Sequence, residues 1–464
     1  GGSCSSSDCG IAAKPDRVIA ALDHRDAGAA IRRLATPNAL ALLGDQLLGI
    51  VDTIAIGALG AAPLAALTGA AAVFMVLAVG MYAWATGVRI VGAQAIGAGE
   101  SERFGTIVRS AAVVPLAIAV GAALVTIVVA RPLLHAILPA SAPLDAAANY
   151  LILRNLCLPI MVVSTLLIVA WATAGDSRLG LRVLIAINVI HVPLVFVLAL
   201  GAGTHHPFGV TGAGISSLIA EFAGLCYALW ATRQRPHYRI FSSWRVEGAL
   251  IRLTAWLSWP EFVFLVLQLL PDPVAIALLA PAGTEAVAAF RALSLVNDAT
   301  WSLPGSLGDA AEIIVGQRIG ARDYDGAKAF TRDALRIALQ VCGGIGLLVA
   351  LLAWPLAALF TLNPALASVA ALPLALQVGL TLPLKGWAMT ILAPIRAAGD
   401  TRFVMLMGIV MTAIAVGGIA LGLRVFHLGL FAVPLGWVCG WIFRGIVTTA
   451  RLRSGDWERR RLSA

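Results

Sequence analysis

Long apolar runs, separated by short polar stretches, alternate along almost the whole chain. The runs from Ala111 to Ala130 and from Val404 to Leu423 each approach the roughly 20 residues that cross a bilayer core. Backbone groups cannot remain unpaired in lipid, so runs of this length predict helices. We predict an all-α membrane protein with twelve transmembrane helices, near residues 35–58, 63–88, 107–130, 143–173, 182–202, 210–231, 253–279, 284–315, 333–358, 364–395, 403–424 and 428–448.

The composition agrees with this pattern. Of the 464 residues, 60% are hydrophobic and 12% are charged, whereas a soluble domain has about 25% charged residues. The net charge is +9, and nearly all Lys and Arg residues fall in the tails and in the loops on one side of the predicted membrane. This asymmetry predicts a multi-pass protein of the cytoplasmic membrane with both termini in the cytoplasm. It also favours a lipid-headgroup anchor over a nucleic-acid site for the Arg459-Arg460-Arg461 cluster.

Several separated signatures occur twice at an almost constant spacing. The spacing is 223 or 224 residues, and the matched stretches are Pro37 and Pro260, Gly60 and Gly283, Gln94–Ala98 and Gln317–Ala321, and Ala174–Arg178 and Ala398–Arg402. A fixed spacing of this kind indicates a duplicated unit of about half the chain. Six predicted helices per half is an even number, so both halves begin on the same side of the membrane and form parallel lobes.

The duplication divides the chain into two lobes, two tails and a linker. The predicted units are a tail at 1–33, an N-terminal lobe at 34–231, a linker at 232–249, a C-terminal lobe at 250–448 and a tail at 449–464. In membrane proteins, two halves related in this way usually enclose a substrate path between them.

The same signatures resemble those of the multidrug and toxic compound extrusion (MATE) family. The stretches that carry the resemblance are Pro37, Gly49–Thr53, Gly57–Gly60, Gln94–Gly99, Gly175–Arg178, Gly209–Ala213 and Gly399–Arg402. Within the family, Leu47–Asp52 leans toward the DNA-damage-inducible subgroup. The resemblance implies two six-helix lobes around a V-shaped cavity and efflux by alternating access. It also implies coupling to inward H+ or Na+, and small substrates that are often cationic and amphipathic.

Two aspartates in the first predicted helix are candidates for ion coupling. Asp52 matches the carboxylate that binds a proton or cation in the family. Binding a proton there removes a charge and can bias the packing of one lobe. Asp45 is seven residues earlier, on about the same helix face and roughly 10 Å deeper. The two carboxylates predict a proton relay or a cation site, while a helix-end role for Asp52 and a permanently protonated Asp45 stay open.

The fifth predicted helix departs from the subgroup pattern. Related members often carry an Asn and, four residues later, an Asp, whereas the matching positions here are His191 and Val195. His191 is a candidate for proton coupling because an imidazole titrates close to neutral pH. An equal alternative is a bond to the carbonyl group that Pro193 leaves free. Asn188, one turn earlier, is included in the predicted coupling site.

The C-terminal half carries its own charged residues near mid-depth. Asp298 and Arg291 are seven residues apart and share a face of the eighth predicted helix, and Lys385 lies in the tenth. We predict a Lys385–Asp298 pair beside a substrate cavity, with Arg291 nearer the outside; a static ion pair is the alternative. Gln268, through its place in the repeat, and Trp387, through its flat aromatic ring, are also predicted to belong to this cavity.

Other charged residues in or near the predicted helices give weaker signals. Asp309 and Glu312 are predicted to form salt bridges at loop level with Arg318 and Arg322. The charged residues without a partner nearby in the sequence are Arg154, Glu221, Glu261 and Asp272.

The motif content favours a secondary exporter over other classes. The sequence has no CxxC pair, HExxH motif or G-x-x-x-x-G-K-[ST] loop, so a metalloenzyme and a primary pump are not expected and no cofactor is predicted. An exporter of organic anions and a flippase for lipid-linked precursors stay open as alternatives. We predict a monomer in the lipid bilayer that is not an enzyme. It couples export of a small molecule to entry of a cation, H+ rather than Na+.

Overall fold

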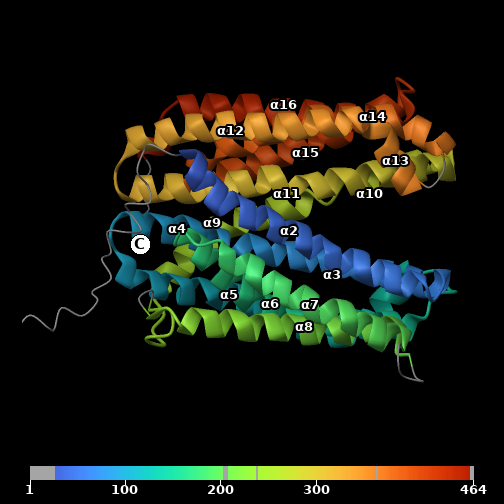
Figure 1. The fold of residues 1–464 in the computed structure, drawn as a ribbon, viewed down its shortest axis with the longest axis horizontal. Coiled ribbons are helices and arrows are strands. Elements are labelled where there is room, and N and C mark those ends of the chain that lie inside the picture. Colours follow the sequence, from blue (N-terminus) through green and yellow to red (C-terminus); the bar gives the residue numbers. More distant parts are fainter. Residues whose placement is uncertain (1–26, 202–206, 237–238, 362–363, 460–464) are drawn as a thin grey trace, which may run out of the picture.

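The computed structural model describes residues 27–201, 207–236, 239–361 and 364–459. Within these residues the chain is almost entirely helical (Figure 1). The helices of the N-terminal half are α2 (Ala27–Gly57), α3 (Ala61–Trp84), α4 (Thr86–Gly97), α5 (Ser101–Ile137), α6 (Leu144–Thr173), α7 (Arg178–Leu200) and α8 (Gly209–Arg233). Those of the C-terminal half are α9 (Gly248–Leu267), α10 (Pro271–Leu279), α11 (Thr284–Gly320), α12 (Tyr324–Leu351), α13 (Ala353–Thr361), α14 (Pro364–Ala397), α15 (Thr401–Arg424), α16 (Ala432–Arg453) and α17 (Asp456–Arg459).

Eleven helical stretches of the described residues are long and apolar enough to cross a membrane. Helices α3 and α4 together form one such stretch, and α9 and α10 form another. The remaining predicted span is α11, whose 37 residues include several charged side chains and are therefore less apolar. Every predicted span corresponds to a helix, which confirms the all-α fold with two groups of six spans.

Several predicted spans are shorter than the observed helices: α4 ends at Gly97 rather than 88, and α12 begins at Tyr324 rather than 333. α2 begins at Ala27, inside the predicted tail at 1–33, and α16 continues to Arg453, past the predicted end at 448. Residues 1–26 of the predicted N-terminal tail lie outside the described residues, as do Arg460 and Arg461 of the basic cluster.

The helices form two layered groups, and α2 crosses from one group to the other (Figure 1). Near its start, Ile31, Leu34 and Ala35 belong to the apolar core of the C-terminal group. Near its end, Ala55 and Ile56 belong to the apolar core of the N-terminal group. A change in the packing at one end of α2 can therefore reach both lobes.

The counterpart of α2 in the second half makes the reciprocal exchange. Leu250 and Leu257 at the start of α9 pack with Ile90, Val91 and Ile107 of α4 and α5 in the N-terminal group. Further along, α9 packs against α15 of its own half. In each lobe, the core thus includes the first turns of one helix that belongs to the other half of the chain.

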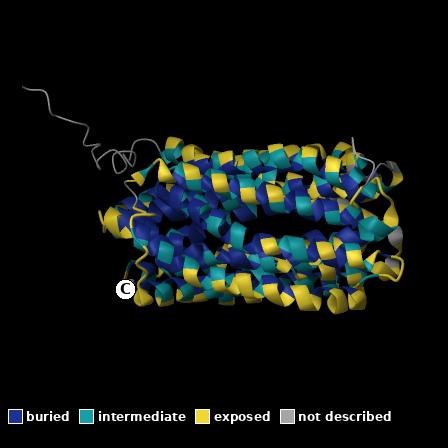
Figure 2. Cartoon of the chain, turned by 90° about the horizontal axis from the view of Figure 1, so that it is seen from below, coloured by how far each residue is buried: buried dark blue, intermediate teal, exposed yellow. Residues whose placement is uncertain are grey.

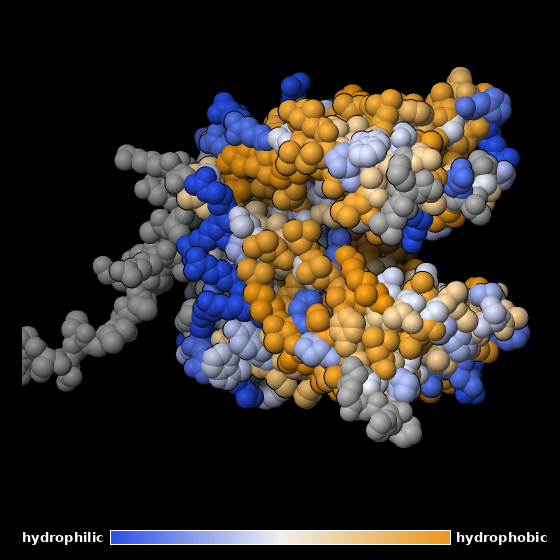
Figure 3. Space-filling model, turned by 45° about the vertical axis from the view of Figure 1, so that its right-hand side comes forward, coloured by the Kyte–Doolittle hydropathy of each residue, from blue (hydrophilic) through white to orange (hydrophobic). Residues whose placement is uncertain are grey.

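The two groups are in close contact at the end where the C-terminus lies, and buried residues gather there (Figure 2). At the opposite end the surface is hollowed between the groups, so the molecule has a cleft with one open and one closed end (Figure 3). The closed end is tight because a Cβ atom on Gly97 would lie 1.8 Å from the carbonyl oxygen of Gln317. A Cβ atom on Gly320 would lie 2.0 Å from the carbonyl oxygen of Gln94, in the equivalent contact of the other half.

The side chains of the repeated glutamines complete this seal. Gln94 Nε2 donates to the carbonyl oxygen of Ala397 at 2.7 Å, and Gln317 Nε2 donates to that of Thr173 at 2.8 Å. The two bonds are equivalent under the repeat, since each joins the glutamine of one half to the end of the fourth span of the other. The repeated signatures therefore meet one another at the closed end.

Candidate functional site

Asp52 of α2 and His191 of α7 form a buried pair. His191 Nε2 lies 2.9 Å from Asp52 Oδ1, and the two residues are 1% and 5% exposed. The other ring nitrogen, His191 Nδ1, has no hydrogen-bond partner among the described residues. Buried polar groups are normally bonded, so an unbonded ring nitrogen in this buried pair is an exception.

A second group of charges lies close to this pair. Arg154 of α6 is within electrostatic reach of Asp52, Asp45 and Glu221, although no direct ion pair joins them among the described residues. The Arg154 guanidinium lies 4.1 Å from the centre of the Phe74 ring, and its Nε atom has no hydrogen-bond partner within the described ranges. The view of Arg154 and Glu221 as separate isolated charges is therefore corrected. Because they lie on α6 and α8, their distance along the chain hid this proximity.

The other two predicted coupling residues lie at a different level. Asp45 is exposed, in contrast to Asp52 on the same helix. Asn188 Nδ2 donates to the carbonyl oxygens of Gly44 at 3.2 Å and Leu184 at 3.0 Å, so it joins α7 to α2. The structure thus brings Asp52 and His191 into contact and places Asn188 beside the turn that carries Asp45.

In the C-terminal lobe, the predicted Lys385–Asp298 ion pair is not formed. Lys385 of α14 is buried and donates to Asn297 Oδ1 of α11 at 2.6 Å, and its ammonium lies 5.4 Å from the centre of the Trp301 ring. Consecutive helix residues point about 100° apart, so only one of two neighbours can face α14. Asn297 takes that place, and Asp298 is exposed.

The predicted grouping of charges is nevertheless present. Arg291 is exposed and lies within electrostatic reach of Asp298, and Asp272, taken as isolated, lies near both of them and near Lys385. Gln268 is half-buried, and its Nε2 atom has no hydrogen-bond partner in the described part of the chain. Trp387 packs against Gly445 of α16 within its own lobe, since a Cβ atom on that glycine would lie 2.3 Å from the ring.

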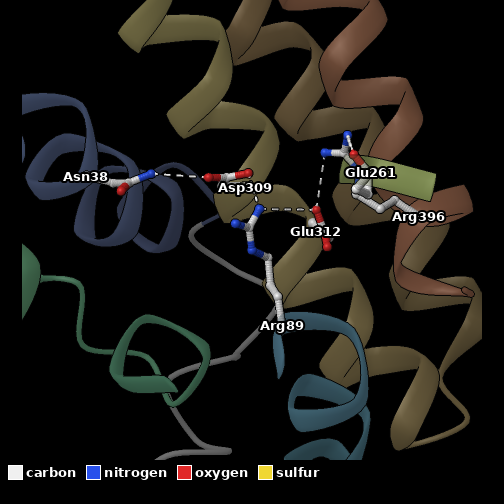
Figure 4. A network of polar contacts seen from close by, with 6 residues as sticks. All are labelled: Asn38, Arg89, Glu261, Asp309, Glu312 and Arg396. Carbon is white, nitrogen blue, oxygen red and sulfur yellow. Dashed lines mark hydrogen bonds and ion pairs between the residues drawn. The ribbon is translucent and has the colours of Figure 1, made fainter. Parts of the chain in front are cut away.

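A network of charges at the closed end was not predicted (Figure 4). Arg89 of α4 contacts Asp309 of α11 and lies 3.4 Å from Glu312 Oε2. Arg396 of α14 forms a two-pronged pair with Glu261 of α9 at 2.8 and 3.1 Å, and lies 3.5 Å from the same Glu312 oxygen. All five side chains are buried or partly buried, so charges from both lobes are paired inside the protein.

This network corrects three sequence expectations. Asp309 and Glu312 bind Arg89 and Arg396 rather than Arg318 and Arg322, because they face the neighbouring helices and not the loop. Arg318 pairs instead with Asp323 at 2.9 Å. Glu261 is likewise not isolated. Arg89 and Arg396 were missed because both were placed in loops, just beyond the predicted ends of their helices.

Comparison with known proteins now identifies the fold. The sequence model of the MatE family matches residues 37–197 and 260–436, which cover both lobes. This chain belongs to the MatE family. Members of this family are transporters, so the MatE chain is a multi-pass membrane transporter and not an enzyme. The subgroup within the family stays a prediction.

Relatives with a name and a solved structure agree with this assignment. The chain is 25% identical over 354 residues to a probable multidrug resistance protein NorM of Neisseria meningitidis serogroup B, covering 73% of this chain and 74% of that protein. It is 26% identical over 437 residues to a probable NorM of Synechocystis sp., covering 88% and 89%. A crystal structure of MATE in the straight conformation matches with a TM-score of 0.85 at 20% identity, covering 94% of this chain and 98% of that one.

Proposed function

We propose that this MatE transporter exports small organic cations in exchange for protons. The observation that carries the proposal is the buried Asp52–His191 pair, to which we assign the binding of the coupling proton. Because Asp52 lies on α2, the helix shared by both lobes, a change of charge there can alter the contact between the lobes. The names of the relatives, which are probable multidrug resistance proteins, support efflux.

The proposed cycle follows from the shape of the cleft. We place the closed end at the cytoplasm, because the loops rich in Lys and Arg lie there. Substrate enters when the lobes part at that end, and it leaves through the end that is open in this structure (Figure 3). Protonation of the Asp52–His191 pair from outside then favours release of the substrate, and loss of the proton to the cytoplasm resets the cycle.

Transport into proteoliposomes tests this proposal. Uptake of a fluorescent organic cation is measured under an imposed pH gradient, under an imposed Na+ gradient and with neither. Uptake should follow the pH gradient, and Asp52→Asn and His191→Gln should each abolish that dependence while the folded yield is retained. Asp145→Asn, at a side chain that is 76% exposed, is the matched control. Uptake that follows only Na+, or that is seen only with organic anions or a lipid-linked precursor, would contradict the proposal.

A further inference from the structure

The two carboxylates of α11 in the charge network, Asp309 and Glu312, are held by a cation from the other lobe. We call this pair the acidic face. Arg89 belongs to α4 in the N-terminal lobe, and it reaches across the closed end to contact both carboxylates. Asn38 of α2, the helix that crosses between the lobes, adds a bond from its Nδ2 atom to Asp309 Oδ2 at 3.5 Å. Arg89 approaches the acidic face from the other lobe, whereas Asn38 comes from the start of α2, which packs with the core of the C-terminal lobe (Figure 4).

Within its own lobe the acidic face is poorly neutralised. Arg396 is committed to Glu261 through two short bonds, and its contact with Glu312 is the longer one at 3.5 Å. In the described part of the chain, the side chains that bind Asp309 are Arg89 of the N-terminal lobe and Asn38 of α2. Separation of the lobes therefore removes the main cation from two neighbouring carboxylates, which then attract a new cation.

The acidic face also has spare acceptor capacity. Glu312 is 1% exposed, and its Oε1 atom has no hydrogen-bond partner among the described residues, because both arginines contact the other oxygen. A carboxylate oxygen that is fully buried and unbonded is rare in folded proteins. Glu312 Oε1 is therefore free to accept a hydrogen bond from a cationic group that directs more N–H donors at the carboxylate than Arg89 does here.

The close main-chain contacts of the closed end near the acidic face are uncharged, while the charged Arg396–Glu261 pair lies within the C-terminal lobe. The Gly97 and Gly320 main-chain contacts and the bonds from Gln94 and Gln317 are neutral. When these contacts separate, they leave polar main-chain groups that water can bond. The acidic face thus attracts positive charge in the opened interface, because it raises the local concentration of cations.

We propose that the acidic face binds the charged group of an organic cation in the conformation that is open at this end, and that Arg89 occupies the same place in the closed conformation. A guanidinium, an amidinium or a protonated amine has the charge and donors to take over the contacts of Arg89. Closure of the lobes then returns Arg89 to Asp309 and Glu312 and displaces the substrate's cation toward the cleft. This inference rests on the proposed export of organic cations, but not on proton coupling.

Binding to the purified full-length protein in detergent tests this proposal without any gradient. Ethidium binding is followed by fluorescence anisotropy. If Arg89 fills the site in about nine of ten molecules, Arg89→Ala should tighten ethidium binding about tenfold, because apparent affinity scales with the fraction of free sites. Methylguanidinium should compete with ethidium and should raise the melting temperature of Arg89→Ala above that in NaCl of equal ionic strength. Adding Asp309→Asn to Arg89→Ala should remove both effects.

A matched variant separates an unmasked site from a merely loosened interface. Gln94→Ala removes a neutral bond at the same interface and leaves the acidic face covered by Arg89. An equal gain in ethidium affinity in Gln94→Ala would overturn the proposal, as would unchanged affinity in Arg89→Ala. If Arg89→Ala does not give folded protein, Arg89→Gln replaces it in every arm. If wild-type uptake in the proteoliposome experiment does not follow the pH gradient while these binding results hold, proton coupling alone would be contradicted.

Discussion

Arg89 and Glu312 are 223 residues apart, which is the spacing of the repeat, and their side chains meet across the closed end at 3.4 Å. The same position of the duplicated unit therefore carries opposite charges in the two halves, and these charges face each other. The repeated residues around them, such as Gly97 and Gly320, are identical and provide the close main-chain contact. The glycines that are identical in the two halves allow the close fit of this interface, and the residues that differ, Arg89 and Glu312, provide the electrostatic attraction.

The coupling between Arg89 and Glu312 can be measured directly. We expect a double-mutant cycle of Arg89→Ala and Glu312→Ala to give an interaction free energy of roughly 1–3 kcal/mol, because both groups are shielded from water. Unfolding in detergent provides the four free energies. Arg131 and Asp145, which are 68% and 76% exposed, provide a control cycle that should give no more than about 0.5 kcal/mol. Equal values in the two cycles would show that the buried pair has no special strength.

The glycine contact predicts a steric effect on closure. Gly97→Ala and Gly320→Ala each place a Cβ atom against main chain that cannot move aside, and overpacking of this kind costs about 1–3 kcal/mol. Both variants should shift the protein toward the conformation open at that end, seen as greater labelling of a cysteine placed near Thr173. Gly343→Ala, where nothing lies within 4 Å of the new atom, should leave labelling unchanged.

The repeated turns predict a pH dependence of stability. Burial opposes ionisation of Asp176, but the hydrogen bonds from Arg235 and from the Arg178 N–H group outweigh it, so the pKa of Asp176 lies below its usual range. A carboxylate whose pKa is lowered by folding stabilises the fold at pH values above its pKa in the unfolded chain, which is near 3.9. This contribution is lost as the pH falls through the pKa of the folded state. The pair with Arg235, at 2.7 Å, is partly exposed, so the contribution is roughly 1 kcal/mol or less.

Melting temperatures of the wild type and of Asp176→Asn, measured from pH 6 to pH 3, test this expectation. The wild type should be the more stable protein at pH 6, and the difference should shrink as the pH drops below the unfolded value. Asp145→Asn, whose carboxylate is largely exposed, serves as the comparison. A difference that stays constant over the whole range would rule out ionised Asp176 as its source.

The Lys385–Asn297 bond predicts an asymmetry between two substitutions. Asn297→Ala should destabilise the protein by about 1–3 kcal/mol, because it leaves the buried ammonium without its bonded oxygen. Lys385→Gln should cost less, since an amide can still donate to Asn297. Asp298→Asn, at the neighbouring exposed residue, should have little effect on stability. A larger loss in Asp298→Asn than in Asn297→Ala would revive the predicted Lys385–Asp298 pair.

The sequence was sufficient for the fold because its signals are local. An apolar run of about 20 residues and a turn such as Gly175-Asp176 each specify their own structure, and the repeat then fixes the number of spans per half. Charge partners are different, because they are set by how helices pack. Glu261 and Arg396 are 135 residues apart, and nothing in either segment points to the other.

One signal for the closed-end network was nevertheless present. Arg89 and Glu312 occupy equivalent positions with opposite charges, and a two-fold relation between the halves brings such positions together near its axis. The second predicted helix ended at residue 88, so Arg89 was placed in a loop and its equivalence to Glu312 was not noticed. The contact between Asp52 and His191 was easier to anticipate, because both residues match positions of the MATE pattern.

The opposite charges of Arg89 and Glu312 also bear on the ancestry of the chain. If the duplicated unit once worked as a pair of identical subunits, a two-fold axis would have placed the same residue opposite itself at this position. Two arginines or two glutamates would then have repelled each other inside the interface. The attraction seen here needs two copies that can mutate separately, so this salt bridge is younger than the duplication. The glycines beside it, equal in both copies, are compatible with the older symmetric assembly.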